Sequence, residues 1–103
     1  MIQLNDSNFE EEVLQSDVPV MVDFYSNHCI PCRSMSIIME NLSEKVDNMK
    51  FAKIEISDSL DTFTEYCISS VPTFIIFVNG EKMEEMIGTY SEEELLGVIY
   101  NYV

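Results

Sequence analysis

The sequence predicts an α/β protein in which helices cover both faces of a central mixed β-sheet. Segments with apolar residues at strand spacing alternate along the chain with segments that have them at helical spacing, which is typical of this class. Asn79-Gly80 is a strong signal for a tight hairpin, so the strands that flank it are expected to pair antiparallel. The predicted order is β-α-β-α-β-α-β-β-α, and a chain of 103 residues has the size of one domain.

The first part of the chain predicts a short strand, a short helix and a buried strand. We expect the first strand over residues 2–4. Ser7 and Glu10 have the spacing of a capping box, which opens a short helix with an apolar stripe formed by Phe9, Val13 and Leu14. Residues 18–25 form a near-continuous apolar run, as in a strand buried on both faces, and Asp23 is its one charged interruption.

The middle of the chain predicts the longest helix, then a strand and a second short helix. The long helix follows a pair of cysteines and is marked by apolar residues at helical spacing: Met35, Ile38, Met39, Leu42, Val46 and Met49. Residues 51–56 are predicted to form a strand, and residues 60–66 a short helix.

The last part predicts a hairpin and a final helix. Residues 73–78 form an apolar strand, and residues 81–87 are its partner, expected at the sheet edge because they are charged. Ser91 and Glu94 form a second capping-box pattern, which opens a helix along Leu95, Leu96, Ile99 and Tyr102.

Composition restricts the partners and the compartment that we expect. The net charge is −14, with only five basic residues, which argues against nucleic acid or an anionic membrane as a partner. The acidity indicates a solvated surface first, and attraction to a basic partner second. The start of the chain has no signal-peptide pattern, and the longest apolar run, residues 74–78, is too short to cross a bilayer. We therefore expect a cytoplasmic protein.

The segment NHCIPC places Cys29 and Cys32 between the buried strand and the longest helix. Functional residues of such sheets collect beyond the carboxyl ends of parallel strands. A helix N-terminus favours a thiolate, and residues three apart share a helix face, so the two sulfurs can meet. Cys29 is expected at the exposed helix tip and Cys32 one turn further in, with Pro31 tolerated in the first turn.

Other uses of this pair fit the sequence less well. Structural zinc needs four ligands, and beyond the pair only Cys67 and His28 remain, with His28 adjacent to Cys29. Arg33 stands where covalent haem attachment needs histidine, and an iron–sulfur cluster needs more cysteines. A permanent disulfide is disfavoured in a reducing compartment. The residues therefore favour a redox pair without a metal.

At this point the chain resembles the thioredoxin family, nearly from end to end. The segments that carry the resemblance are VDFYSNHCIPCR, FAKIEISD, SVPTFIIFVNGE and MIGTYSEEEL, in that order. The resemblance implies a single thioredoxin-like domain over residues 1–103, with the thioredoxin fold and protein thiol–disulfide oxidoreductase activity. It further implies a monomer that holds no cofactor, acts on protein disulfides, and receives electrons from a separate thioredoxin reductase or another donor.

The resemblance also implies roles for individual residues. Cys29 would be the nucleophile and Cys32 the resolving thiol. Asp23 would be a buried carboxylate beneath Cys32 that moves its proton; the alternative is a polar residue that faces water. Lys53 would lie near Asp23; the alternative is a solvated lysine.

A second group of residues would support or contact the substrate. Pro72 would follow a cis peptide bond and face the disulfide. Val71, Ile30 and Gly88 would contact the substrate, with Gly88 as the point where the two backbones approach; its alternative is a bulge in an edge strand. Pro31 would support the active site.

Three departures from the family change the region around the cysteines: His28 replaces tryptophan, Ile30 replaces glycine, and Ile37 replaces a proline in the long helix. A protonated His28 would favour the Cys29 thiolate; the alternative is an exposed histidine without a partner. Cys67 is expected to pack at the end of the short helix, with a regulatory or dimerising thiol as the alternative. A second interpretation of the whole chain is a thioredoxin-fold binding module for a dedicated partner.

Overall fold

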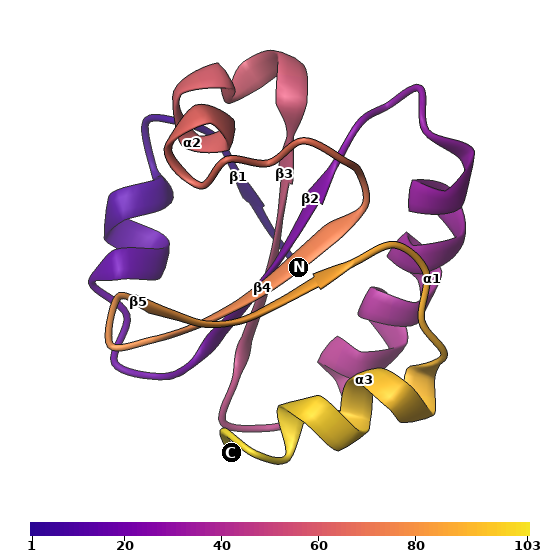
Figure 1. The fold of residues 1–103 in the computed structure, drawn as a ribbon. Helices are drawn as coiled ribbons and strands as arrows, with labels where there is room; N and C mark the ends of the chain where they lie inside the picture. The colour runs from indigo at the N-terminus through magenta and orange to yellow at the C-terminus, as the bar shows by residue number, and fades with distance from the viewer.

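The sheet has five strands in the order β1-β3-β2-β4-β5 in the computed structural model, which describes residues 1–103. The strands are β1 (Ile2–Leu4), β2 (Val20–Tyr25), β3 (Lys50–Glu55), β4 (Thr73–Val78) and β5 (Glu81–Ile87). The first three run parallel, whereas β4 is antiparallel to both β2 and β5. The predicted mixed sheet, with β5 at its edge, is therefore confirmed (Figure 1).

Helices cover both faces of this sheet, as the sequence predicts (Figure 1). On one face lie the helices α1 (Ile30–Lys45) and α3 (Glu92–Ile99); on the other lie the short π-helix η1 (Glu10–Leu14) and α2 (Leu60–Glu65), which follows a 3₁₀ turn, η2 (Ile56–Asp58). None of the helices is long and apolar enough to pass through a membrane.

Alternation along the central strands divides the core into two layers. In β2, Met21 packs with the residues of α1 and α3, whereas Val20, Val22 and Phe24 pack with those of η1 and α2. Asp23 therefore lies on the same face of the sheet as Met21. In β3 the same alternation places Lys53 on the α1 face, in register with Asp23.

Several predicted boundaries are wrong by a few residues. The strand predicted over residues 18–25 begins at Val20, and Val18 is exposed. The strand predicted over residues 51–56 is β3, one residue earlier.

The apolar spacing also overestimates the length of two helices. The helix α1 ends at Lys45 because Val46 is extended and Asn48 has a φ of 66°. Val46 and Met49 nevertheless pack in the core. Their burial therefore continues the helical spacing, although their backbone is not helical. Tyr102 lies beyond α3 and donates a hydrogen bond to Glu84 Oε1 at 3.0 Å.

The predicted capping box at Ser7 and Glu10 is wrong. Asn5 begins the turn instead: its Oδ1 accepts from the backbone N–H of Asn8 at 3.1 Å, and its own N–H donates to Asn8 Oδ1 at 2.8 Å. This reciprocal pair satisfies the same two groups as a capping box, three residues apart. The capping box of Ser91 and Glu94 is confirmed, with both of its hydrogen bonds present.

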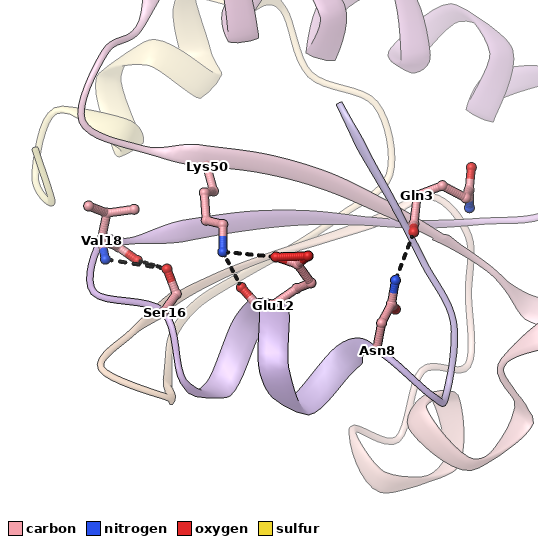
Figure 2. A network of polar contacts seen from close by, with 6 residues as sticks. All are labelled: Gln3, Asn8, Glu12, Ser16, Val18 and Lys50. Carbon is pink, nitrogen blue, oxygen red and sulfur yellow. Dashed lines mark hydrogen bonds and ion pairs between the residues drawn. The ribbon is translucent and has the colours of Figure 1, made fainter.

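Side chains from separate elements fasten η1 to the sheet (Figure 2). Lys50 Nζ donates to the backbone oxygen of Glu12 at 2.7 Å and lies 3.2 Å from its Oε1. Asn8 Nδ2 donates to the backbone oxygen of Gln3 at 3.2 Å. The connection after η1 is closed by Ser16 Oγ, which donates to Val18 O at 2.8 Å.

The predicted hairpin between β4 and β5 is confirmed. Asn79 and Gly80 have φ values of 53° and 80°, as a type I′ turn requires at both central positions. Glycine is needed at the second position for a further reason, because a Cβ atom there would lie 2.8 Å from the backbone oxygen of Leu14.

Candidate functional site

The cysteine pair lies at the N-terminus of α1, directly after the carboxyl end of β2. Cys29 and Cys32 are joined by a disulfide, with their Cα atoms 5.2 Å apart. Cys29 is the N-cap residue and is half-buried, whereas Cys32 is only 3% exposed. An incoming group can therefore reach the first sulfur much more readily than the second.

The environment of Cys29 suits a thiolate when the disulfide is reduced. Its Sγ accepts a hydrogen bond from the backbone N–H of Cys32 at 3.2 Å. It also stands at the positive end of the helix α1, which favours a negative charge. Cys29 Sγ lies 3.8 Å from the carbonyl oxygen of Val71, so the segment before Pro72 borders the reactive sulfur.

Asp23 is a buried acid on the same face of the sheet as α1. It is 1% exposed, and its Oδ1 has no hydrogen-bond partner. Burial raises the pKa of Asp23 from 3.8 to about 7, although the positive charge of Lys53 opposes the shift. A carboxyl group with this pKa can both accept and release a proton near neutral pH.

A cavity of about 290 Å³ connects this acid with the resolving cysteine. Asp23, Cys32 and Lys53 all line it, together with residues from α1 such as Ser36 and Ile37. A cavity of this size has room for water, which can bridge groups that do not touch. Proton transfer between Asp23 and Cys32 is therefore sterically possible.

Lys53 lies near Asp23 but forms no ion pair within 4.0 Å. Its Nζ lies 5.9 Å from the centre of the Tyr25 ring, within the range of a cation–π contact. The ammonium group thus lies beside the cavity without an ion pair to Asp23, and its charge only partly offsets the effect of burial. This arrangement is consistent with the raised pKa of Asp23.

A rim of backbone and apolar groups surrounds Cys29. The peptide bond between Val71 and Pro72 is cis. Gly88 donates its N–H to the carbonyl oxygen of Pro72 at 2.9 Å and has a φ of 101°, which favours glycine. Ile30 is 73% exposed, directly beside the disulfide. Pro31 occupies the first turn of α1, as expected from its missing N–H.

The other two departures from the family, His28 and Ile37, and the third cysteine lie in different surroundings. His28 is exposed and donates its backbone N–H to Ser26 Oγ at 3.2 Å. Ile37 is exposed at the edge of the cavity. Cys67 is a free, exposed thiol with a φ of 55°, so its expected packing at the helix end is wrong. No cluster of three or more potential metal-ligating side chains is present.

Glu55 and Tyr25 belong to this region, and sequence reasoning missed both of them. Glu55 is 4% exposed, and its Oε2 accepts the backbone N–H of Asn27 at 3.1 Å. Tyr25 lies two positions after Asp23 in β2, and Glu55 lies two positions after Lys53 in β3, so Tyr25 and Glu55 are also in register with each other. Strand alternation places all four residues on the α1 face of the sheet, but this conclusion requires the register of β2 and β3.

Comparison with known proteins gives a consistent result over nearly the whole chain. A family model described as Thioredoxin matches residues 1–101. A thioredoxin of Rickettsia bellii is 37% identical over 101 residues, 97% of this chain and 96% of that protein. A thioredoxin of Rickettsia prowazekii is 40% identical over 94 residues, 90% of each chain. Thioredoxin M4, chloroplastic, of Arabidopsis thaliana is 41% identical over 101 residues, 97% of this chain and 52% of that protein.

Proposed function

Because the chain belongs to the thioredoxin family, we propose that it reduces disulfide bonds of proteins through Cys29 and Cys32. The chain is a thiol–disulfide oxidoreductase of thioredoxin type. The observation that carries the proposal is the disulfide at the tip of α1, with one half-buried sulfur and one buried sulfur. Nothing in the structure or the comparisons favours a binding module without this activity.

The reaction begins with the reduced pair. The Cys29 thiolate attacks one sulfur of a substrate disulfide, which forms a mixed disulfide and releases the other substrate sulfur as a thiolate. Cys32 then loses its proton and attacks Cys29 Sγ, so that the second substrate thiolate leaves. Two electrons have passed to the substrate, the two released thiolates take up protons, and the Cys29–Cys32 disulfide remains. A separate electron donor, such as a thioredoxin reductase, restores the dithiol.

In this scheme Asp23 receives the proton of Cys32 through water in the shared cavity. The buried thiol has little direct access to bulk solvent, and Asp23 is the buried acid that lines the same cavity; Glu40, which also lines it, is exposed. Lys53 limits how far burial raises the pKa of Asp23, and so keeps the carboxyl group able to ionise near neutral pH.

The substrate chain binds across the rim around Cys29. The cis peptide bond leaves the Val71 carbonyl beside Cys29 Sγ, and Gly88 lies next to Pro72 without a side chain in the way. Ile30 offers an exposed apolar contact at a position where the family has glycine. This set of groups suits an extended backbone with apolar residues near its cysteine.

We further propose that the chain acts as a single domain and a monomer, in the cytosol. Cys67 is an unpaired thiol, which suits a reducing compartment. The alternative compartment is the chloroplast, since that location is part of the name of one relative. Gel filtration of the reduced protein at several concentrations tests the oligomeric state, and a monomer should elute at the same volume at every concentration.

A trapping experiment tests the order of attack. With Cys32→Ser, the mixed disulfide on Cys29 cannot be resolved, so disulfide-linked complexes with substrate proteins should accumulate. With Cys29→Ser, no such complexes should form through Cys32, and reduction of a model protein disulfide should cease. Cys67→Ser serves as the control and should retain activity. Complexes linked through Cys32, or full activity of Cys29→Ser, would refute the proposed order.

A further inference from the structure

Glu55 is a buried carboxylate directly beneath the loop that leads to the active site. It is the last residue of β3 and is 4% exposed. Its Oε1 accepts the backbone N–H of Ser57 at 2.9 Å and also the Ser57 hydroxyl, and its Oε2 accepts the N–H of Asn27 at 3.1 Å. It takes part in none of the ion pairs of the protein. A buried acid without an ion pair needs such donors to remain charged.

The bond to Asn27 ties the loop of residues 26–28 to the sheet. The other hydrogen bonds of this loop are local: His28 N–H donates to Ser26 Oγ, and Cys29 N–H donates to Ser26 O at 3.2 Å. The bond from Asn27 to Glu55 is the one that reaches another element. Asn27 precedes Cys29 by two residues, so Glu55 helps to determine where the helix tip and its sulfur lie.

The hydrogen-bond donors around Glu55 keep its carboxyl group charged. Hydrogen bonds from Ser57 are the main reason that the pKa of Glu55 is lowered, with smaller contributions from Asn27 and from the charge of His28. The carboxylate is therefore negative at neutral pH. Tyr25 is the residue opposite Glu55 in the register of β2 and β3, and Lys53 lies over the Tyr25 ring.

We propose that Glu55 is a positioning residue for the redox reaction. Its carboxylate holds the loop before Cys29 through the Asn27 N–H, and so helps to fix Cys29 at the tip of α1. In that position the helix N-terminus and the Cys32 N–H favour the Cys29 thiolate that attacks the substrate. The inference rests on the proposed function, because it takes Cys29 as the attacking thiol.

Alkylation of the reduced protein by iodoacetamide tests this role without any substrate. Glu55→Gln keeps the shape of the side chain but removes its charge and one acceptor for the loop. At about pH 6, alkylation of Cys29 should slow by roughly threefold, the size of one weakened hydrogen bond. In a His28→Gln background the same change should cause the same loss, because Glu55 acts through the Asn27 N–H. A loss that requires His28, or no loss in either background, would overturn the proposal.

The chain provides its own controls for this measurement. Exposed Cys67 serves as the internal reference thiol, and tandem mass spectrometry assigns the modified cysteine. Glu81→Gln removes an exposed glutamate without a hydrogen bond or ion pair and should change nothing. If Cys32 is alkylated in place of Cys29, the proposed function fails. If Cys29 is alkylated without any effect of Glu55, only the present inference fails.

A measurement on the unchanged protein covers the case in which Glu55→Gln does not fold. Hydrogen exchange of the Asn27 amide should be slower than that of Asn48 by roughly tenfold or more, since only the former is held by a buried acceptor. Asn48 is the same residue type in an exposed loop. Equal exchange rates would show that Glu55 does not hold the loop, and the proposal would be abandoned.

Discussion

The two faces of the sheet are built from different side chains. The α1/α3 face contains five of the seven methionines, namely Met21, Met35, Met39, Met49 and Met86. The η1/α2 face contains four of the six phenylalanines, and all aromatic ring pairs of the protein lie there, such as Phe9 with Phe77 at 5.7 Å and 79°. Methionine adapts to irregular space, whereas edge-to-face rings need a defined geometry.

The faces also differ in how they use their acids. Asp23, on the α1/α3 face, has no hydrogen-bond partner for Oδ1, and burial raises its pKa. Asp6, on the η1/α2 side, accepts hydrogen bonds from Thr62, mainly from its hydroxyl at 2.6 Å, and its pKa is lowered. One acid weakens the folded state at neutral pH and the other strengthens it. Both faces hold a buried apolar cluster, but the acid that lowers stability lies on the α1/α3 face, beside the cavity that Cys32 lines.

The largest expected effect is on stability at Asp23. Its folded-state pKa lies above the ordinary value of 3.8, so folding takes up a proton between about pH 4 and pH 7, and stability falls as the pH rises through this range. Asp23→Asn should therefore stabilise the oxidised protein by up to about 4 kcal/mol at pH 8. The gain should shrink as the pH falls and vanish near about pH 3, where Asp23 is largely protonated in both states.

Denaturant unfolding at both pH values measures this difference. Asp17→Asn is the matched control, because Asp17 is exposed and forms no hydrogen bond through its side chain. A gain that does not depend on pH would mean that the asparagine side chain packs better, rather than that a buried charge has gone.

The next effect concerns the packing of the two faces. Phe77→Leu removes two edge-to-face ring pairs and should destabilise the protein by about 1–3 kcal/mol. Met39→Leu, at a fully buried site on the other face, should cost less than about 1.5 kcal/mol. Thermal and denaturant unfolding of both variants give the two values. Equal losses would show that the methionine face is packed as strictly as the aromatic one.

The smallest effect is expected at Asp6. Asp6→Asn keeps an acceptor oxygen but removes the charge, so it should destabilise the protein by about 0.3–1 kcal/mol at neutral pH, the size of a charge at an exposed helix N-terminus. Because the folded-state pKa is lowered, this contribution is present above about pH 4 and is lost as the pH falls further. Unfolding curves of wild type and variant should therefore converge in acid, as for Asp23, but the variant should be the less stable protein at neutral pH, whereas Asp23→Asn should be the more stable one. Divergence in acid would contradict the assignment.

Much of the fold follows from the sequence. The order of the elements is as predicted, and β4 and β5 have the predicted bounds. The apolar spacing predicted that the long helix continues through Val46 and Met49. This is wrong because their side chains are buried although the backbone has already left the helix. Pattern alone does not show where a backbone changes direction.

The site shows the same limit. The cysteine pair and Asp23 are visible because a charge interrupts an apolar strand just before a helix. Glu55 is not, because its burial depends on the register of two strands and on a loop that covers its end. The exposure of Cys67 was also missed, since the residue leaves the helix with a positive φ that its sequence neighbours do not indicate.

The central claim is that buried Asp23 accepts the proton of Cys32 when the mixed disulfide is resolved. Stopped-flow kinetics with a model protein disulfide separate the first attack by Cys29 from the decay of the mixed disulfide. At about pH 7, Asp23→Asn should slow that decay by roughly 100-fold, the lower range of general base catalysis, and leave the first attack within about twofold of wild type. Decay of the mixed disulfide at the wild-type rate would contradict the claim.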